Sequence, residues 1–366
     1  MNWYEIKHEE SIDSPALILY KERVQQNIEL VLKMRDASLL RPHVKTNKIA
    51  EVCKMMLDAG ITKYKCATVA EAEMLGMINA PDVLIAYQPT PVKAKRMAAL
   101  IQKYPSTHFS CLIDDSVNAE NISAVFNAGN ICVDVYIDVN DGMNRTGIKP
   151  QNAFQLFQEC ENLTGIKIIG LHVYDGHIRN TDVEERKQKT DAAFNDVAAL
   201  VEKIELSTNM KLNIVAGGSP TFPVHAQRRD VECSPGTFIF WDHGYKTILP
   251  DEPFDYAALV ITRVISIIDE HTICVDLGHK SIAAENVIEK RVHFLNAQNI
   301  QFSGQSEEHL VLKVEDAAQY KVGDVFYGVP YHICPTVALY ERAVIVENNQ
   351  VVGEWSVIAR DRKISV

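Results

Sequence analysis

Lys45 is the residue whose type and position point most directly to chemistry. It follows the apolar segment 39–44, which we expect to be a strand, and it precedes a helix-length pattern at 48–59. A lysine amine held at the end of a strand can attack an aldehyde and bind a carbonyl cofactor as a Schiff base. The residues alone leave a second interpretation open, in which Lys45 is a surface lysine in a loop.

Two glycine-containing segments are candidates for binding a phosphate. They are 216–221, Ala-Gly-Gly-Ser-Pro-Thr, and 234–237, Ser-Pro-Gly-Thr, and each follows a predicted strand. Small residues let backbone N–H groups approach a phosphate closely, and serine or threonine hydroxyls add donors. Taken singly, each segment is also typical of an ordinary turn. The residues that we expect at this site are Gly217, Gly218, Ser219, Thr221, Gly236 and Thr237.

His332 and Cys334 are separated by one residue and form a candidate metal pair. If this segment is extended, the two side chains point to the same side and can reach one ion. Imidazole together with a thiolate favours zinc over magnesium or calcium. Two protein ligands would leave positions open for water and substrate, as a catalytic metal requires. His-x-Cys also occurs by chance, so the spacing alone is a weak signal.

Eight apolar runs, most of them separated by amphipathic stretches, are the elements that would position these side chains. Their alternation with helix-length patterns such as 70–78 and 182–206 predicts an α/β fold, a parallel TIM-like (β/α)8 barrel. In such barrels the chemistry lies at the carboxyl ends of the strands, and a phosphate commonly binds after strands seven and eight. An open doubly wound sheet is the competing architecture. The predicted strands are 39–44, 64–67, 83–87, 108–113, 132–139, 168–174, 212–216 and 231–234.

The sequence changes character after about residue 255. Short runs rich in β-branched residues follow, separated by turn signals such as Asn348-Asn349, which predicts an all-β carboxyl-terminal domain. We therefore expect a barrel over residues 15–250 and a β domain formed by residues 1–14 and 251–366, with the metal pair in the β domain. The expected strands of that domain are 257–268, 271–275, 290–294, 310–314, 324–328, 342–347 and 351–357.

The composition narrows the class of protein. The 366 residues are 47% hydrophobic and 23% charged, which is typical of a globular protein, and the formal net charge is -11. An acidic protein of this kind is not expected to bind nucleic acid, because phosphate backbones need a basic surface. No apolar run approaches 18 residues and the amino terminus does not resemble a signal peptide, so we expect no membrane span. The eight scattered cysteines lack a CxxC pair and predict reduced thiols in the cytoplasm.

Five segments together resemble a known family. They are Pro42-His43-Val44-Lys45-Thr46, Met143-Asn144-Arg145-Thr146-Gly147, Gly217-Gly218-Ser219-Pro220-Thr221, Ser234-Pro235-Gly236-Thr237 and Tyr331-His332-Ile333-Cys334-Pro335-Thr336. The chain is similar to the fold-type III pyridoxal-phosphate enzymes, which have an alanine-racemase-like barrel followed by a β domain. Within them it resembles the D-threonine aldolase and eukaryotic-type D-serine dehydratase group. The resemblance extends from about residue 14 to residue 357.

The resemblance implies roles for several residues. Lys45 would be the Schiff-base lysine and, once released, the base that removes the α proton. Arg145 would lie beside the ring of the pyridoxal phosphate, and Tyr174 is a plausible neighbour of the cofactor. His332 and Cys334 would bind zinc, although aldolase-like members have a carboxylate in place of the cysteine and use manganese. One departure stands out, because alanine racemases have an arginine where this chain has Ser234.

A metal gives the expected chemistry a direction. A Lewis acid on a β-hydroxyl group can assist loss of hydroxide, giving dehydration and release of ammonia, or can stabilise an alkoxide, giving retro-aldol cleavage. The predicted function is a lyase that acts on a small β-hydroxy-D-amino acid by one of these two routes. His177 is our candidate for a base near the β-hydroxyl group, with His172 and the segment 242–244 as alternatives.

Two other functions stay open at the level of the sequence. One is an amino-acid racemase, which would need no metal. The other is a noncatalytic pyridoxal-phosphate carrier, against which the sizeable β domain argues. We expect a homodimer, because the active sites of the resembled enzymes are completed near a subunit interface and twofold dimers are the commonest assembly.

Overall fold

The computed structural model describes residues 2–366. The chain divides into two compact units. One contains Met1–Leu30, Thr46–Val52 and Thr237–Arg360, and the other contains Val31–Lys45, Cys53–Gly236 and Asp361–Val366. This division differs at the amino terminus from the predicted boundary at residue 15. We call them the β unit and the barrel unit.

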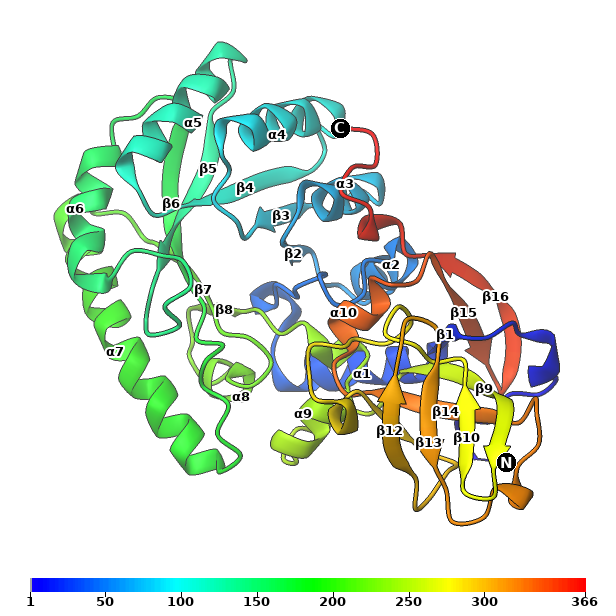
Figure 1. Ribbon diagram of the computed structural model, residues 1–366. Helices are drawn as coiled ribbons and strands as arrows, with labels where there is room; N and C mark the ends of the chain where they lie inside the picture. Colours follow the sequence, from blue (N-terminus) through cyan, green and yellow to red (C-terminus); the bar gives the residue numbers. More distant parts are fainter. Residues whose placement is uncertain (1) are drawn as a thin grey trace. The chain divides into compact units, whose positions relative to one another are not determined.

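The barrel unit contains a parallel sheet of seven strands in the order β2-β3-β4-β5-β6-β7-β8. Strand order follows chain order because a helix-length connection returns the chain between consecutive strands (Figure 1). The strands are β2 (Lys63–Cys66), β3 (Asp82–Ile85), β4 (His108–Ile113), β5 (Val133–Val139), β6 (Ile166–Val173), β7 (Asn213–Ala216) and β8 (Val231–Cys233). Each begins and ends within two residues of the predicted strand.

The first predicted strand is replaced by an irregular segment that closes the barrel. Leu40 forms a bridge with Cys233 of β8, and His43 forms one with Lys65 of β2. Pro42 has no N–H to donate, so a continuous ladder cannot form through this segment. The buried guanidinium of Arg41 holds the segment in place, with its nitrogens 2.6 Å from carboxylate oxygens of Glu232 and Asp82. The predicted (β/α)8 barrel is thus confirmed, with an irregular first strand.

Helices lie outside the barrel strands (Figure 1). Three of them begin with a side-chain cap, in which Thr68, Asp115 and Asp182 accept from the backbone N–H three residues on. Within the barrel, the buried side chains of Leu84, Leu112, Tyr136 and Val215 pack together. The helices from the barrel segments are α2 (Ala50–Asp58), α3 (Val69–Met77), α4 (Pro91–Lys103), α5 (Ser116–Ala128), α6 (Pro150–Cys160), α7 (Val183–Thr208) and α8 (Phe222–His225), and α1 (Lys21–Met34) precedes them.

The β unit contains a nine-stranded sheet whose main path is β12-β13-β10-β9-β1-β15-β16, with β14 pairing β9 and β11. Strand β1 (Ala16–Tyr20) joins this sheet parallel to β15, with Leu17 opposite Ala343, although the prediction placed it in the barrel. The other strands are β9 (Ala258–Asp269), β10 (Thr272–Val275), β11 (Val292–Phe294), β12 (Gln301–Gln305), β13 (Leu310–Lys313), β14 (Val325–Pro330), β15 (Arg342–Glu347) and β16 (Gln350–Ser356), and the short helices are α9 (His243–Ile248) and α10 (Ile333–Val337).

The mixed sheet has its own apolar core, which includes Ile18, Tyr20, Leu259 and Ile261. The prediction of an all-β region after residue 255 is confirmed, apart from the short helix α10. Among residues 2–366, no helix is both long and apolar enough to cross a membrane.

Candidate active site

The ring of Tyr174 is the centre of a cluster of cations in the barrel unit. Tyr174 follows β6, and Arg145 Cζ, Lys45 Nζ and Lys65 Nζ lie 4.7, 5.5 and 5.7 Å from the centre of its ring. A Cβ on Gly218 would come 2.9 Å from the same ring. The structure therefore brings together Lys45, Arg145, Tyr174 and Gly218, all of which the sequence nominated, and adds Lys65.

Lys65 is buried and contacts a chain of polar side chains. Its Nζ lies 3.4 Å from Nε2 of His172, and Nδ1 of His172 lies 2.7 Å from an oxygen of Asp138. The Asp138 carboxylate can only accept, so Nδ1 carries the proton and Nε2 is free to accept from Lys65. The second oxygen of Asp138 accepts from Gln88 at 2.7 Å. Strands β2, β5 and β6, of which only β5 and β6 are neighbours in the sheet, thus supply one connected set.

Electrostatics set the protonation of these hydrogen-bonded side chains. Burial, assisted by the nearby Lys45, lowers the pKa of Lys65 to about 7. Burial and the neighbouring Lys65 lower the pKa of His172, against the opposing effect of Asp138. Burial raises the pKa of Asp138, but the hydrogen bond from His172 outweighs it, and the pKa lies below its ordinary value. Lys65 is consequently an amine that gains or loses its proton near neutral pH.

The loop that carries Arg145 also contains an acid with a strongly shifted pKa, Asp141. Burial and the charges of Asp175 and Asp138 raise the pKa of Asp141 to about 7. Its Oδ1 is buried and has no hydrogen-bond partner among the described residues. The exposed side chain of His177 packs beside this loop, since a Cβ on Gly142 would lie 2.8 Å from its Nε2. His177, our candidate base, thus lies against the loop of Arg145 and is not part of the hydrogen-bonded set that contains Lys65.

The loop after β7 is shaped as a cradle. Gly217 has a φ of +78°, and a Cβ at this residue would lie 2.7 Å from His225. Thr221 donates its hydroxyl to Asp175 at 2.7 Å, and His225 Nε2 lies 2.8 Å from the other oxygen of that carboxylate. These contacts fix the loop, so Thr221 serves the fold of the cradle rather than offering a free donor.

The second glycine segment meets the same loop. The backbone N–H of Gly236 donates to the hydroxyl of Ser219 at 3.4 Å. Thr237, the next residue, belongs by its contacts to the β unit, where its hydroxyl lies 3.9 Å from Cys334 Sγ. The cradle of Gly217, Gly218, Ser219 and Gly236 has the close backbone and the small side chains that a phosphate monoester requires. These residues fit the predicted cofactor.

A pocket of about 770 Å³ opens above Lys45. It is built from the ends of β2 and β3, the first turns of α4, the loop of Arg145 and the tail at Arg362. This volume accommodates a cofactor together with an amino acid. We call it the Lys45 pocket, and its lining residues are His43, Lys45, Ala67, Thr68, Val69, Ile85, Ala86, Tyr87, Gln88, Pro89, Lys93, Arg96, Met97, Arg145, Thr146 and Arg362.

The candidate metal pair lies in the β unit at the start of α10. His332 has an extended backbone, but Ile333–Val337 is helical, so the predicted extended segment is wrong at Cys334. Pro335 is tolerated in a first helical turn, where its missing N–H would have no intrahelical partner. The two side chains nevertheless interact directly. Among the described residues, no group of three or more His, Cys, Asp or Glu side chains is arranged to hold a metal ion.

The surroundings of His332 suit a bound cation. Nδ1 of His332 lies 2.5 Å from an oxygen of Glu285, which leaves Nε2 for a metal, as is usual for metal-binding histidines. Burial lowers the pKa of His332, but Cys334, Asp242 and Glu285 outweigh burial and raise the pKa to about 9. Thr46, the residue after Lys45 in the chain, has its hydroxyl 3.2 Å from Cys334 Sγ. Nitrogen, sulfur and a supporting carboxylate form a donor set that fits zinc.

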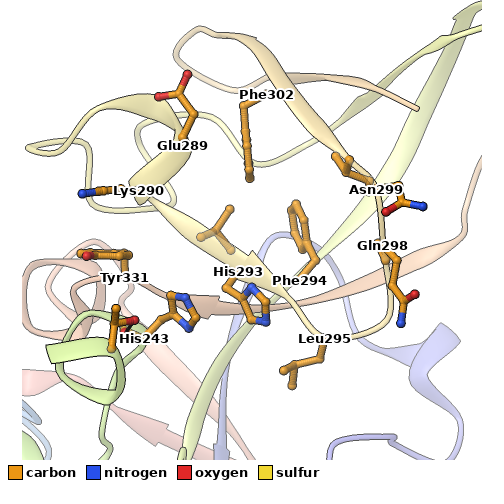
Figure 2. Close-up of a pocket in the computed structure, with 14 residues that line it drawn as sticks. His243, Glu289, Lys290, His293, Phe294, Leu295, Gln298, Asn299, Phe302 and Tyr331 are labelled. Atoms are coloured by element: carbon orange, nitrogen blue, oxygen red, sulfur yellow. Dashed lines mark hydrogen bonds between the residues drawn. The ribbon is translucent and has the colours of Figure 1, made fainter. Parts of the chain in front are cut away.

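The β unit has a second pocket, of about 720 Å³, beside Tyr331. Figure 2 shows the rings of His243 and His293 side by side within it. The ring centroids are 4.3 Å apart and the ring planes are nearly parallel. Burial and the adjacent His293 lower the pKa of His243 to about 4, so this ring is neutral at physiological pH. Parallel stacking does not direct two ring nitrogens at one ion, so these histidines are not a metal pair.

Comparison with known proteins defines the family. Residues 20–243 match the model of the alanine racemase N-terminal domain, and residues 257–346 match a putative serine dehydratase domain. The chain belongs to the alanine racemase-like family. The order of the two domains confirms the predicted resemblance to the D-threonine aldolase and D-serine dehydratase group of this family.

Relatives of this alanine racemase-like chain carry different activities. It is 26% identical to 3-hydroxy-D-aspartate aldolase of Paracoccus denitrificans (strain Pd 1222), over 97% of this chain and 94% of that protein. It is 23% identical to D-threo-3-hydroxyaspartate dehydratase of Delftia sp. (strain HT23), over 90% and 93%. The crystal structure of D-threonine aldolase from Filomicrobium marinum superposes with a TM-score of 0.86 at 25% identity and covers 95% of this chain and 96% of that one.

Proposed function

We propose that this chain is a pyridoxal-phosphate-dependent lyase that acts on β-hydroxy-D-amino acids. The observation that carries the proposal is the cluster on Tyr174, where Lys45, Lys65 and Arg145 face one aromatic ring beside the glycine cradle. The relatives named above are aldolases and a dehydratase for substrates of this class. Dehydration with deamination and retro-aldol cleavage are both compatible with the geometry.

Lys45 would hold the cofactor covalently through Nζ, and the cradle of Gly217, Gly218, Ser219 and Gly236 would bind its phosphate. Arg145, which lies over the face of Tyr174, would bind an anionic oxygen on the ring of the cofactor. Bound pyridoxal phosphate supplies an electron sink for bonds broken at the α-carbon of an amino acid. These residues would hold the ring and the phosphate of the cofactor and leave its reactive carbonyl carbon within reach of Lys45.

The proton of the α-carbon would be taken by Nζ of Lys45 once that amine is released from the cofactor. Lys65 supports this role, because its amine faces the same ring and can hold or release a proton near pH 7. His172 accepts from Lys65 and keeps its own Nδ1 proton on Asp138. A base whose pKa lies near the working pH transfers protons most effectively.

A divalent metal would be held by Nε2 of His332 and Sγ of Cys334. Zinc is the ion that this donor pair favours, and manganese is the alternative that some members of the resembled group use. Such an ion would act as a Lewis acid toward the β-hydroxyl group. Glu285 orients the imidazole from its other nitrogen. The chemistry of these two donor atoms, rather than a complete set of protein ligands, supports this part of the proposal.

We further propose a homodimer in the cytoplasm. All eight cysteines are free, and Cys132 is exposed, which is typical of proteins kept in a reducing compartment. Light scattering at micromolar concentration tests the assembly, and a monomeric mass would contradict it.

Product identification tests the proposed function. The purified protein, loaded with cofactor and zinc, is incubated with the D- and L-forms of threonine, serine and 3-hydroxyaspartate. We expect either an aldehyde with glycine, or ammonia with a keto acid, from the D-forms, and loss of this activity on treatment with a chelator. Formation of the opposite enantiomer without cleavage, unaffected by the chelator, would instead indicate a racemase.

A further inference from the structure

The Lys45 pocket carries an excess of positive charge. Five of its lining residues are cations, namely Lys45, Lys93, Arg96, Arg145 and Arg362, and none of its described lining residues is Asp or Glu. The chain as a whole has a formal net charge of -11, so the pocket is opposite in sign to the protein. A concave site of one sign concentrates ligands of the opposite sign.

The cofactor accounts for only part of this charge. Lys45 would be consumed in the covalent link, and Arg145 faces the ring of Tyr174. The phosphate cradle follows β7 and β8, whereas Lys93 and Arg96 lie on α4, after β3, several strands away in the sheet. Three further cations, Lys93, Arg96 and Arg362, therefore line the pocket beyond the two that the cofactor would engage.

The side chains of Lys93 and Arg96 are held in place by their neighbours. Lys93 Nζ lies 3.7 Å above the ring of Tyr87. Arg96 donates from Nη2 to a main-chain oxygen of Val366 at 2.7 Å and to the carbonyl oxygen of Arg362 at 3.1 Å, which ties the tail to α4. Arg362 thereby becomes part of the pocket wall. Gln88, which also lines the pocket, donates its side-chain amide to the carboxylates of Asp114 at 2.9 Å and Asp138 at 2.7 Å.

We propose that the Lys45 pocket selects a β-hydroxy-D-amino acid whose side chain ends in a second carboxylate. The inference rests on the proposed function and names its substrate class. One cation suffices for the α-carboxylate that every amino acid has, so the others are available for a second anion. A neutral side chain would leave Lys93 and Arg362 without a charged partner in the filled pocket, which costs affinity. The relatives include enzymes named for a neutral substrate and enzymes named for dicarboxylic substrates. The positive charge of this pocket favours the dicarboxylic class.

Binding of D-aspartate and D-alanine to the holoenzyme tests the selectivity without lyase chemistry. Neither compound has a β-hydroxyl group, so neither can undergo dehydration or retro-aldol cleavage, and the change in cofactor absorbance reports binding directly. We expect D-aspartate to bind at least about tenfold more tightly, the gain typical of one charge-assisted hydrogen bond. Equal affinities, or tighter binding of D-alanine, would overturn the inference.

Variants locate the effect. Lys93→Gln and Arg362→Gln should each weaken D-aspartate binding by several-fold more than D-alanine binding, whereas Lys95→Gln, on the exposed side of the same helix, should change neither. If both variants keep the selectivity of the wild-type protein, the assignment of the second carboxylate to this wall is wrong. Turnover of D-3-hydroxyaspartate beside D-threonine separates the two claims. Absence of cleavage of any substrate refutes the lyase, whereas cleavage with a preference for D-threonine refutes only the dicarboxylate selectivity.

Discussion

Lys65 Nζ lies 3.4 Å from Nε2 of His172 inside the barrel. Lys65 is only 2% exposed, and a lysine is almost never buried so completely unless it is paired or functional. The partner is an imidazole whose other nitrogen is held by the carboxylate of Asp138. The fold thus tolerates a costly group beside Lys45, which is typical of active sites.

Lys65→Met should separate activity from stability. The pKa of Lys65 is about 7 in the folded protein and about 10.4 in an unfolded chain. Between these values the unfolded chain binds more protons, so stability rises with pH from about 7 to 10, and below 7 the cost of burial is fully present. Methionine removes this cost.

At pH 7 the variant should therefore unfold at a higher temperature than the wild-type apo protein, while turnover falls about 100-fold or more. Lys54→Met, at an exposed position of α2, is the matched control and should change neither. Thermal unfolding and the pH dependence of kcat/KM measure the two effects. An unchanged pH profile would show that Lys65 takes no part in proton transfer.

Gly217→Ala should weaken cofactor binding for a local reason. Gly217 and Gly60 both have positive φ, +78° and +92°, so alanine at either costs about 1–2 kcal/mol of stability. Only at Gly217 does the added Cβ meet the cradle, 2.7 Å from His225, whereas at Gly60 nothing lies within 4 Å. Titration with pyridoxal phosphate should show a loss of affinity of more than about tenfold for Gly217→Ala alone. Equal losses in the two variants would indicate a general effect of instability.

Cys334→Ala should remove the metal together with the lyase activity. The thiolate supplies one of only two expected protein ligands, so its loss should leave no zinc by elemental analysis and lower turnover at least about 100-fold. The visible absorbance of the cofactor should remain. Cys132→Ala, which removes an exposed free thiol, is the control. A variant without metal that keeps full activity would contradict the metal-dependent mechanism.

The sequence predicts the barrel well because parallel strands buried on both faces form continuous apolar runs. The exception is the segment before Lys45, where Pro42 prevents a regular ladder. Strand β1 could not be predicted, because its partners Val260 and Ala343 lie hundreds of residues away and no local pattern records that pairing. Cys334 is another exception, because the sequence suggests an extended segment and the residue lies in the first turn of α10.

Several residues of the candidate site could not be found from the sequence. Lys65 sits in the run Lys63-Tyr64-Lys65-Cys66, where it resembles an ordinary solvent-facing residue of a strand. Its function depends on the barrel closing, which turns β2 toward β6 and His172. Glu285 lies 47 positions from His332 and in a loop without a motif. A charged residue one position before the end of an apolar strand was the only available signal for Lys65.

The stability of the barrel unit should depend on pH through His108. Hydrogen bonds to Asp134 and Asp82 raise the pKa of His108 to about 9 from an ordinary value near 6.5. A raised folded pKa gives a contribution that is fully present below pH 6.5 and is lost as the pH rises through 9. The imidazole is half exposed, so the expected size is only about 0.5 kcal/mol. Urea unfolding of His108→Gln should show this deficit at pH 6 and none at pH 10, and a deficit equal at both would contradict the assignment.

The most direct test of the account is to identify the lysine that carries the cofactor. The holoenzyme is reduced with borohydride, digested, and analysed by mass spectrometry for a peptide with a pyridoxyl-phosphate modification. We expect a single modified site at Lys45, with no modification and no turnover in Lys45→Ala. Lys65 offers a second amine near the same ring, so the digest distinguishes two real alternatives. Modification of Lys65 in the wild-type protein, or of neither lysine, would contradict the proposed active site.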